Sequence, residues 1–363
     1  ADEVIPADVT VCMQAIKTGL MRFPAFKFTG EIEVVDLGLP ADSQAERQIQ
    51  REVVTAEQVH ALLPERALDS HKGTFGSALI AAGSLNYTGA VLLAAEAAYR
   101  VGAGLVRAAV PSVIHSIIAG QIPEATWVLL PNDLGVISEP AAEVLLENLK
   151  PSTAVLLGPG WGLEDTTFRF LEAFLRREPM NHARGGIGFL GKEITDSGID
   201  RTLPPLVVDA DGLKLLSRIR DWTKVLPADT ILTPHPGEMA VMTGLPVDRI
   251  QAERLETAES YAREWQQVVV LKGALTIVAA PDGRSTTIPV ATPALARAGT
   301  GDVLAGLIVG LRAQGLSAYD AAVCGAWIHA QAGLVAACQV GHPAAVLAGD
   351  IIRAIADVLQ GLG

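Results

Sequence analysis

The residues with the clearest chemical potential form a glycine-rich loop, AGTGD (298–302), that opens directly into an apolar, helix-like run. Gly299 and Gly301 allow a tight turn with exposed backbone N–H groups, and the following helix adds the positive end of its dipole. This combination predicts a phosphate site. Asp302 would lie beside the phosphate, where a carboxylate can take a proton from an attacking hydroxyl. The competing interpretation is an ordinary aspartate helix cap.

Two further polar segments follow apolar runs. In TPHPGE (233–238), His235 could bond a ligand and Glu238 could hold a metal through water, but the same pair could simply cap a helix. The turn from Lys272 to Thr276 offers a cation, backbone N–H groups and a hydroxyl, which suits a nucleotide phosphate. Lys272 could equally be a solvated lysine on an edge strand.

Other candidate residues are less specific. Asp209 and Asp211 could bind metal or cap a helix, and capping is favoured. Gly160 lies in a glycine-rich strand exit that would let a ligand approach the backbone, and HKGTFG (71–76) could close over a ligand. His329, on a nearly all-apolar helix, is expected to be a satisfied buried histidine rather than a ligand. The sequence has no P-loop ending, nucleophile elbow, His-Glu-x-x-His motif or dinucleotide fingerprint.

The elements that must position these residues alternate between short apolar runs and helix-length segments. This alternation predicts an α/β fold with a mostly parallel central sheet and helices on both faces. In such a sheet, ligands bind at the carboxyl ends of the strands, where most of the polar residues fall. The expected strands lie within residues 77–83, 105–111, 154–160, 206–212, 230–237, 268–273 and 275–283, the last two forming a hairpin-like pair.

Composition narrows the class of function. The chain has 363 residues, of which 50% are hydrophobic and 19% charged, so it is globular rather than disordered. Its formal net charge of −12 argues against binding to nucleic acid or to an anionic membrane surface. Three cysteines without a CxxC pair fit a reduced, cytoplasmic compartment. The apolar stretch 321–337 contains His329 and Gln331, and we expect a buried helix rather than a membrane span.

The chain divides into three parts. Residues 1–40 resemble the last strands of a domain that lies upstream, and the polar residues 41–54 are the expected linker. Residues 55–363 form the expected main domain. Within it, residues 178–202 interrupt the strand–helix alternation, and we assign them no role.

Six ordered motifs over roughly residues 55–360 resemble the ADP-dependent NAD(P)H-hydrate dehydratase family of the ribokinase-like superfamily. They are HKGTFGSALIAAGSLNYTGAVLLAAEAAYRVGAGLV, LGPGWG, VVDADGL, ILTPHPGEMAVMTG, VVLKGALTIVA and TPALARAGTGDVLAGLIVGL. The resemblance implies a ribokinase-like three-layer fold. It also implies repair of NADHX and NADPHX, in which ADP phosphorylates the ring hydroxyl, AMP and phosphate are released, and NADH or NADPH is restored.

The resemblance also implies roles for individual residues. Asp302 would be the base toward the hydrate hydroxyl, and the hydrate would also contact Ala90, Gly160 and His235. Magnesium would accompany ADP, with Glu238 as the candidate holder through water. The nucleotide would contact Lys272, Gly273, Ala274, Leu275, Thr276, Gly299, Thr300 and Gly301.

Residues 1–40 resemble the tail of the NAD(P)HX epimerase domain often fused ahead of the dehydratase. That domain's catalytic part would lie upstream, so we expect no epimerase activity from this chain, although a full-length protein would be bifunctional. Family members often form tetramers, and we expect a homotetramer. Two alternatives remain: an ATP-dependent small-molecule kinase of the same superfamily, and a non-catalytic nucleotide-binding regulator.

Overall fold

The computed structural model describes residues 4–39, 49–177 and 202–362. Its centre is a ten-stranded sheet in which all neighbouring strands are parallel except the pairs β12–β13 and β13–β14. In sheet order, the strands are β3 (Arg51–Val53), β14 (Ser285–Thr287), β13 (Ile277–Ala279), β12 (Val268–Leu271), β11 (Ile231–Leu232), β10 (Leu206–Val208), β9 (Ala154–Leu157), β4 (Ser77–Ala81), β5 (Leu105–Pro111) and β6 (Thr126–Leu130).

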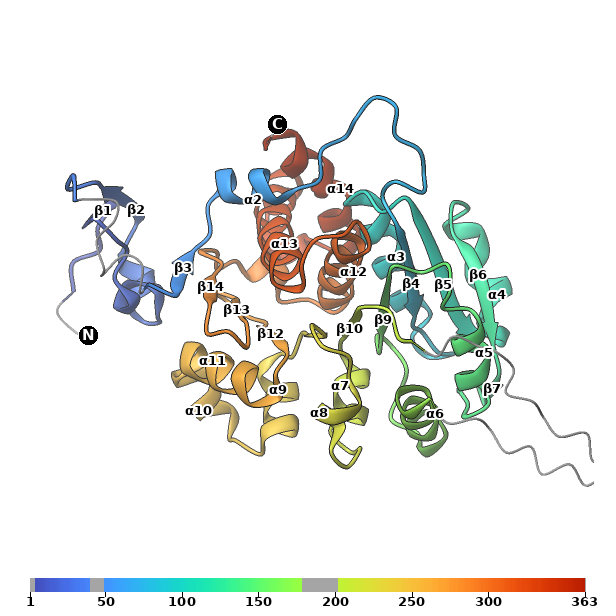
Figure 1. Ribbon diagram of the computed structural model, residues 1–363. Coiled ribbons are helices and arrows are strands. Elements are labelled where there is room, and N and C mark those ends of the chain that lie inside the picture. Colours follow the sequence, from blue (N-terminus) through green and yellow to red (C-terminus); the bar gives the residue numbers. More distant parts are fainter. Residues whose placement is uncertain (1–3, 40–48, 178–201, 363) are drawn as a thin grey trace, which may run out of the picture.

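Helices cover both faces of this sheet, which confirms the predicted three-layer α/β architecture (Figure 1). One core contains α2 (Ala56–Leu62), α3 (Thr88–Arg100), α4 (Ser112–Ile118), α12 (Thr300–Ala313), α13 (Ala318–Val340) and α14 (Ala348–Gln360). The other contains α5 (Ala141–Glu147), α6 (Asp165–Arg176), α7 (Asp211–Leu216), α8 (Trp222–Val225), α9 (Pro236–Thr243), α10 (Val247–Ala252) and α11 (Arg254–Trp265).

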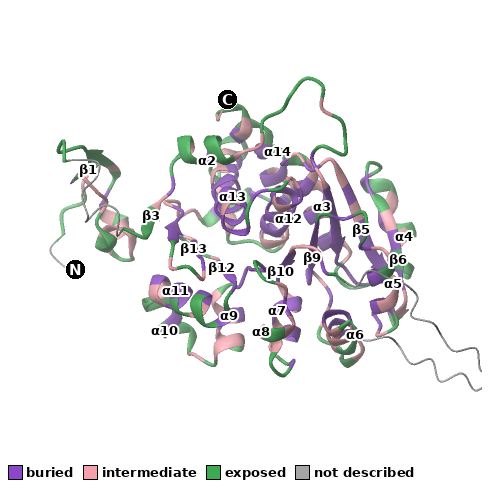
Figure 2. Ribbon diagram, viewed as in Figure 1, coloured by how far each residue is buried: buried purple, intermediate pink, exposed green. Residues whose placement is uncertain are grey.

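The central strands are apolar at every position because both of their faces are covered. Along β9, Ala154 and Leu156 belong to one core while Val155 and Leu157 belong to the other, and all four are fully buried. Alternate side chains of a strand point to opposite faces, so a sheet between two helical layers needs this continuous apolar pattern. Figure 2 shows the buried residues concentrated along the sheet and the helices packed on it.

Helix α12 begins at the predicted phosphate loop, and small residues hold it close to α3. A Cβ atom on Gly306 would lie 2.2 Å from the Ala94 carbonyl oxygen, and one on Gly310 would lie 2.9 Å from the Ala98 Cα. The two helices therefore pack backbone to backbone, which no larger residue would permit. This contact fixes the position of residues 299–302.

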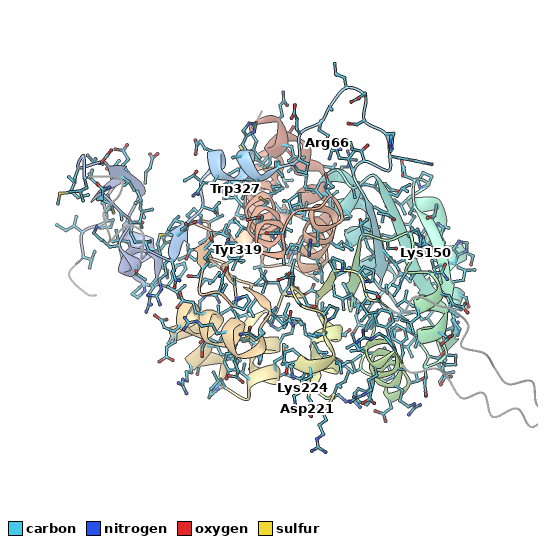
Figure 3. The ribbon with its side chains drawn as sticks, viewed as in Figure 1. Arg66, Lys150, Asp221, Lys224, Tyr319 and Trp327 are labelled. Atoms are coloured by element: carbon cyan, nitrogen blue, oxygen red, sulfur yellow. The ribbon has the colours of Figure 1, made fainter. Side chains whose placement is uncertain are left out.

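Helix α13 is long and apolar enough to cross a membrane, but 72% of its most hydrophobic window is buried within the molecule. It packs between α12 and α14, and its Tyr319 hydroxyl shares a 2.7 Å hydrogen bond with Thr286 of β14. Figure 3 labels Tyr319 and Trp327, both on this helix. These contacts support the prediction of a core helix.

The N-terminal segment forms a small separate sheet in which β1 (Val9–Met13) pairs in parallel with β2 (Glu31–Val35). Several of its apolar side chains are exposed, including Val11 and Met13. An ion pair between Arg22 and Glu256 of α11 joins the segment to the main body. Three residues of the predicted linker form the edge strand β3, and most of the unassigned stretch 178–202 lies outside the described residues.

The remaining elements are short. A hairpin of β7 (Asn132–Asp133) and β8 (Val136–Ile137) follows β6. The single-turn helices are η1 (Thr18–Met21), η2 (Ala25–Phe28), η3 (Ala119–Gln121), η4 (Pro293–Leu295) and η5 (Pro343–Ala345).

Candidate active site

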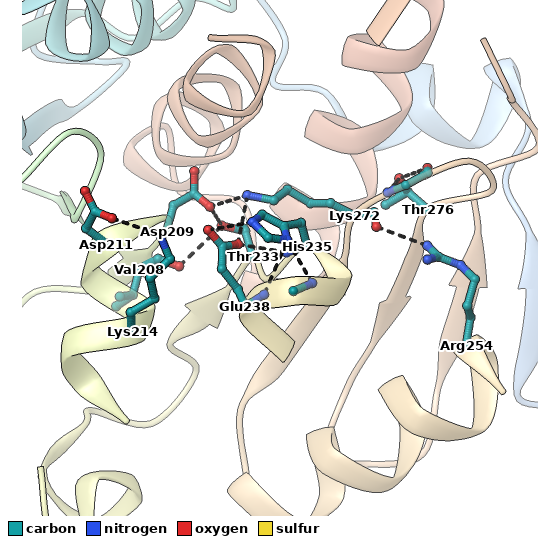
Figure 4. A network of polar contacts seen from close by, with 12 residues as sticks. Val208, Asp209, Asp211, Lys214, Thr233, His235, Glu238, Arg254, Lys272 and Thr276 are labelled. Atoms are coloured by element: carbon teal, nitrogen blue, oxygen red, sulfur yellow. Dashed lines mark hydrogen bonds and ion pairs between the residues drawn. The ribbon is translucent and has the colours of Figure 1, made fainter. Parts of the chain in front are cut away.

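The ends of β10, β11 and β12 bring a group of ionisable side chains together in front of α12 (Figure 4). Asp209 follows β10, His235 follows β11 and Lys272 follows β12, so each lies at the carboxyl end of its strand. This is the edge at which parallel sheets bind ligands. After Lys272 the chain turns and runs antiparallel to β12 as β13, which confirms the predicted hairpin-like pair.

Asp209 and Lys272 form a buried ion pair at the centre of this group. The Lys272 Nζ donates to Asp209 Oδ1 at 2.5 Å, and the Thr233 hydroxyl donates to the same oxygen at 2.7 Å. Burial opposes the charge on Lys272, but Asp209 and Glu238 outweigh it and the pKa of Lys272 is raised. Lys272 is therefore not a solvated edge lysine, because β12 lies inside the sheet.

The favoured capping role of Asp209 and Asp211 is wrong. Helix α7 begins after Ala210 without a side-chain cap. Asp211 lies in the first turn of α7, where one carboxylate oxygen accepts from the Gly162 N–H at 3.0 Å and the other from Lys214 at 3.0 Å. It therefore ties α7 to the glycine-rich exit of β9, while Asp209 faces Lys272.

His235 and Glu238 form the reciprocal cap that the sequence allowed. The His235 Nδ1 accepts from the N–H groups of Gly237 and Glu238, and the Glu238 carboxylate accepts from the His235 N–H at 2.8 Å. With Nδ1 acting as an acceptor, the neutral ring carries its proton on Nε2. Burial, aided by the charge on Lys272, lowers the pKa of His235. The half-exposed ring still borders the pocket described below.

The turn after β12 is held by its own hydrogen bonds. The Gly273 N–H donates to the Thr276 hydroxyl at 3.3 Å, and that hydroxyl donates to the Gly273 carbonyl at 2.8 Å. The Leu275 N–H donates to Val290, and its side chain is buried away from this pocket. The partly buried Arg254 guanidinium, on α11, donates to the carbonyls of Leu271 and Lys272 and so stabilises the turn. No sequence motif singled out Arg254.

The glycine-rich loop enters α12 through a left-handed residue. Gly299 is the N-cap with φ +89°, and it provides no side-chain cap. The Thr300 hydroxyl donates to the carbonyls of Leu295 and Arg297, both at 2.9 Å, which ties the preceding loop to the helix. Asp302 is the third residue of α12, so the interpretation as an ordinary aspartate N-cap is wrong.

Asp302 differs from its charged neighbours because its carboxylate has no hydrogen bond or ion pair among the described residues. Burial raises the pKa of Asp302 to about 7, and the charge of Asp209 adds to the rise while Lys272 opposes it. Asp302 is partly buried and does not itself line the pocket described below, although its neighbours Thr300 and Gly301 do. A partly buried acid with a pKa near neutrality beside such a pocket is a candidate general base.

A pocket of about 720 Å³ lies in front of the β12 turn and the α12 N-terminus. This volume is within the usual range for small-molecule sites. Its lining combines apolar side chains, including Leu295 and Leu304, with polar groups at Lys272, Thr300 and Arg297. Among the predicted site residues, those that line it are His235, Lys272, Gly273, Ala274, Thr276, Thr300 and Gly301.

Ala90 and Gly160 lie against each other next to this cluster. Gly160 has φ +66°, and a Cβ added to it would lie 2.8 Å from the Ala90 Cβ. Ala90 is in the first turn of α3, and Leu93 of the same helix lies against Gly299. The structure therefore brings these two residues together on the α3 side of the phosphate loop, apart from the 720 Å³ pocket.

His329 is buried as predicted, but only one of its two ring nitrogens has a partner, because the ring bonds the Thr300 backbone through the other nitrogen alone. Only 8% of its surface is exposed, and its Nε2 has no hydrogen-bond partner among the described residues. The ring borders the same pocket together with Thr300 and Leu304. The expectation of a satisfied core histidine is therefore wrong, because no polar group of α12 or of the neighbouring loop reaches Nε2.

A family model described as NAD(P)H-hydrate dehydratase matches residues 78–180 and 189–357, which is most of the chain. The chain belongs to the NAD(P)H-hydrate dehydratase family. The match includes the strand ends, the β12 turn and the glycine-rich loop. The family predicted from six motifs is thereby confirmed.

Curated relatives agree with this family assignment. The chain is 39% identical over 362 residues to a bifunctional NAD(P)H-hydrate repair enzyme of Moorella thermoacetica, covering 99% of the chain and 63% of the relative. It is 36% identical to an ADP-dependent (S)-NAD(P)H-hydrate dehydratase of Bacillus subtilis, covering 71% of the chain and 79% of the relative. The chain thus spans less than two thirds of the length of its bifunctional relatives.

Solved structures support the dehydratase fold. A Bacillus subtilis ADP/ATP-dependent NAD(P)H-hydrate dehydratase co-crystallised with ATP and Mg²⁺ has a TM-score of 0.66 and 29% identity, covering 86% of this chain and 99% of that one. A ribokinase-like protein of Enterococcus faecalis has a TM-score of 0.69 at 21% identity, covering 86% of this chain and 97% of that one. The latter supports the ribokinase-like fold alone.

The site fits a magnesium ion held mainly by a nucleotide. No group of three or more His, Cys, Asp or Glu side chains among the described residues could hold a metal. Glu238 is 3% exposed, and its oxygens face the His235 N–H, the His235 ring and Lys272. Mg²⁺ commonly keeps several waters and binds substrate phosphates. With its oxygens engaged in this way, Glu238 is not placed to bind the ion directly.

Proposed function

We propose that this chain catalyses the nucleotide-dependent dehydration of NADHX and NADPHX to NADH and NADPH, with ADP as the phosphoryl donor and AMP and phosphate as products. The observation that carries this proposal is the position of Asp302. A partly buried, unpaired carboxylate with a pKa of about 7 lies at the N-terminus of α12, beside the loop expected to hold a phosphoryl group. The family membership and the ADP-dependent relative support the same conclusion.

The proposed chemistry makes a poor leaving group into a good one. Asp302 takes the proton of the hydrate hydroxyl while the hydroxyl oxygen attacks the β-phosphorus of ADP, and the bond to AMP breaks. The ring nitrogen then pushes out phosphate as the C–O bond breaks, and loss of a proton from the adjacent carbon restores the ring double bond. A base with a pKa near the working pH is best suited to the first proton transfer.

Backbone and side-chain groups of this chain would orient the reactants. The N–H groups at the start of α12, including those of Thr300 and Gly301, would hold the transferring phosphoryl group. Lys272 to Thr276 would contact the nucleotide, and Ala90, Gly160 and His235 the hydrate. Magnesium, held by phosphate oxygens and through water by Glu238, would neutralise negative charge on the nucleotide.

The deciding experiment incubates the chain with NADHX, Mg²⁺ and either ADP or ATP, and follows NADH absorbance with product analysis. We expect NADH, AMP and phosphate to accumulate together when ADP is present. Recovery of a phosphorylated hydrate that is not dehydrated would favour the small-molecule kinase. Nucleotide binding without turnover of any substrate would favour the regulator.

Residues 1–40 are proposed to be the tail of an epimerase-like domain without a catalytic role in dehydration. Removing them should leave the dehydration rate within about a factor of two, because none of the predicted site residues lies in this segment. A folded truncated chain that lacks activity would contradict this proposal. A homotetramer is proposed as well, and a light-scattering mass of four chains would support it.

A further inference from the structure

Among the described residues that line the 720 Å³ pocket, His329 has a buried polar side-chain atom without a partner. His329 projects from the middle of α13, and its Nε2 is buried with no hydrogen bond among the described residues. A buried polar atom without a partner costs free energy, and most such atoms in native proteins are satisfied. The atom therefore calls for a partner from outside the chain.

The surroundings of His329 indicate what that partner is. Leu295 and Leu304 line the same pocket as His329, and Gly333, one turn beyond His329 on α13, lies against the Leu295 side chain. A flat heteroaromatic ring would fit against these apolar side chains with one polar edge toward His329. Lys272 and Gly301, which also line the pocket, would hold an anionic group. A nucleotide has both of these parts.

The protonation state of the His329 ring determines whether Nε2 donates or accepts a hydrogen bond. Burial lowers the pKa of His329 to about 4, so the ring is neutral at physiological pH. A hydrogen bond to the Thr300 backbone opposes this effect and raises the pKa of His329. The ring N–H therefore donates to the Thr300 carbonyl. A neutral imidazole has one donor and one acceptor, so the unpartnered Nε2 is the acceptor.

We propose that His329 Nε2 accepts a hydrogen bond from the exocyclic amino group of an adenine base and so selects adenine nucleotides over those with a carbonyl oxygen at the same position. This inference rests on the proposed function, which places a nucleotide in this pocket. It adds a base-specificity residue that no sequence motif indicated. A carbonyl oxygen at that position would face the lone pair of Nε2 and bind more weakly.

The test compares ADP with IDP, which has a carbonyl in place of the amino group. Isothermal titration with Mg²⁺ present would give the dissociation constants for the wild type, His329→Asn and His329→Gln. Asparagine places its polar atoms near the Nδ1 position, whereas glutamine reaches the Nε2 position. The control is Cys324→Ala, a change at a fully buried residue of the same helix that does not line the pocket.

We expect the wild type and Cys324→Ala to bind ADP about tenfold more tightly than IDP, the effect of one buried hydrogen bond. His329→Asn should lose this preference, mainly through weaker ADP binding, and His329→Gln should keep ADP affinity close to wild type. An unchanged preference in His329→Asn, or a wild type that does not discriminate, would overturn the inference but not the proposed function. A wild type that binds neither nucleotide would overturn both.

Discussion

Two regions of the active site bury ionisable groups in opposite ways. At the strand ends, Asp209 and Lys272 neutralise each other's charge at 2.5 Å, and the Thr233 hydroxyl donates to the same Asp209 oxygen. On the neighbouring helices α12 and α13, Asp302 is partly buried and His329 is buried, each without an ion pair among the described residues. Burial shifts the pKa of each in the direction that favours its neutral form.

This difference distinguishes paired groups, which stabilise the site, from unpaired groups, which are free to interact with a ligand. A buried charge is tolerated when it is paired, and removing one partner leaves the other uncompensated. An unpaired acid or imidazole instead loses its charge, and it becomes available for proton transfer or hydrogen bonding. We therefore expect loss of Asp209 to affect mainly stability, and substitutions in the second region to affect mainly activity. Substitution of Lys272 should affect both, because Lys272 is also proposed to contact the nucleotide.

The largest expected effect is on Asp302. Asp302→Asn keeps the size of the side chain but removes the base, so the dehydration rate should fall by about 10²–10⁴. ADP affinity should barely change, because the backbone N–H groups and Lys272 remain. The measurements are the NADH production rate, the ADP dissociation constant and the melting temperature. A near-normal rate would refute the assignment, and parallel losses in all three would make Asp302 structural.

The stability of this variant sharpens the comparison further. Because the pKa of Asp302 is higher in the folded state, the unfolding free energy of the wild type falls as the pH rises from about 4 to about 7. Asp302→Asn has no carboxyl to ionise and avoids this fall, so the variant should be at least as stable as the wild type at pH 8.

Breaking the paired region should have the opposite result. Within the described part of the chain, Asp209→Asn leaves Lys272 with one ion-pair partner, Glu238 at 3.6 Å, and we expect a loss of about 3 kcal/mol of unfolding free energy. Urea unfolding followed by circular dichroism would measure it. The double variant Asp209→Asn with Lys272→Met, which removes both charges, should recover part of the loss. If the single variant is as stable as the wild type, the pair does not hold the site.

The pH dependence reports directly on the unpaired acid. Asp302 must be ionised to act as a base, so the rate should be about tenfold lower at pH 6 than on the plateau above pH 8. Initial rates from pH 5.5 to 8.5 at saturating substrate would test this. The negative charge of Asp209 contributes to the raised pKa of Asp302. In an active Asp209→Asn enzyme, the rate should therefore begin to fall at a lower pH than in the wild type. A flat profile would contradict the role of Asp302.

A smaller effect is expected at Thr233. Thr233→Val removes one buried hydrogen bond to Asp209 while keeping the shape of the side chain, and it should cost about 1 kcal/mol of unfolding free energy. The dehydration rate should stay within a few-fold of the wild type, because Lys272 still holds the carboxylate. A large loss of activity without loss of stability would mean that Thr233 belongs with the unpaired groups.

The smallest effect provides the reference. Arg249 and Glu253 form an exposed ion pair one helical turn apart, and Arg249→Ala should cost no more than about 0.5 kcal/mol. Its activity should be normal. A cost as large as that of Asp209→Asn would mean that burial does not explain the difference between the two kinds of pair.

The sequence alone determined the α/β architecture, the family and the candidate residues on strand ends. Apolar runs such as residues 154–157 and 268–271 are short and are followed by a glycine within two residues, and such runs form strands wherever both faces are covered. The loop AGTGD predicted a turn into a helix because only glycine readily adopts the backbone angles that it requires. These features depend on local chemistry, which a sequence displays directly.

Only the tertiary structure decided which polar groups are paired. Asp209 and Lys272 are 63 residues apart, and nothing local distinguishes an aspartate that caps a helix from one that meets a lysine across a sheet. Arg254 likewise stabilises the turn after β12 from α11, a separate element of the fold. For His329, the sequence predicted burial but not the missing partner. Burial follows from the pattern along one helix, whereas hydrogen bonding depends on which atoms the whole fold brings within reach.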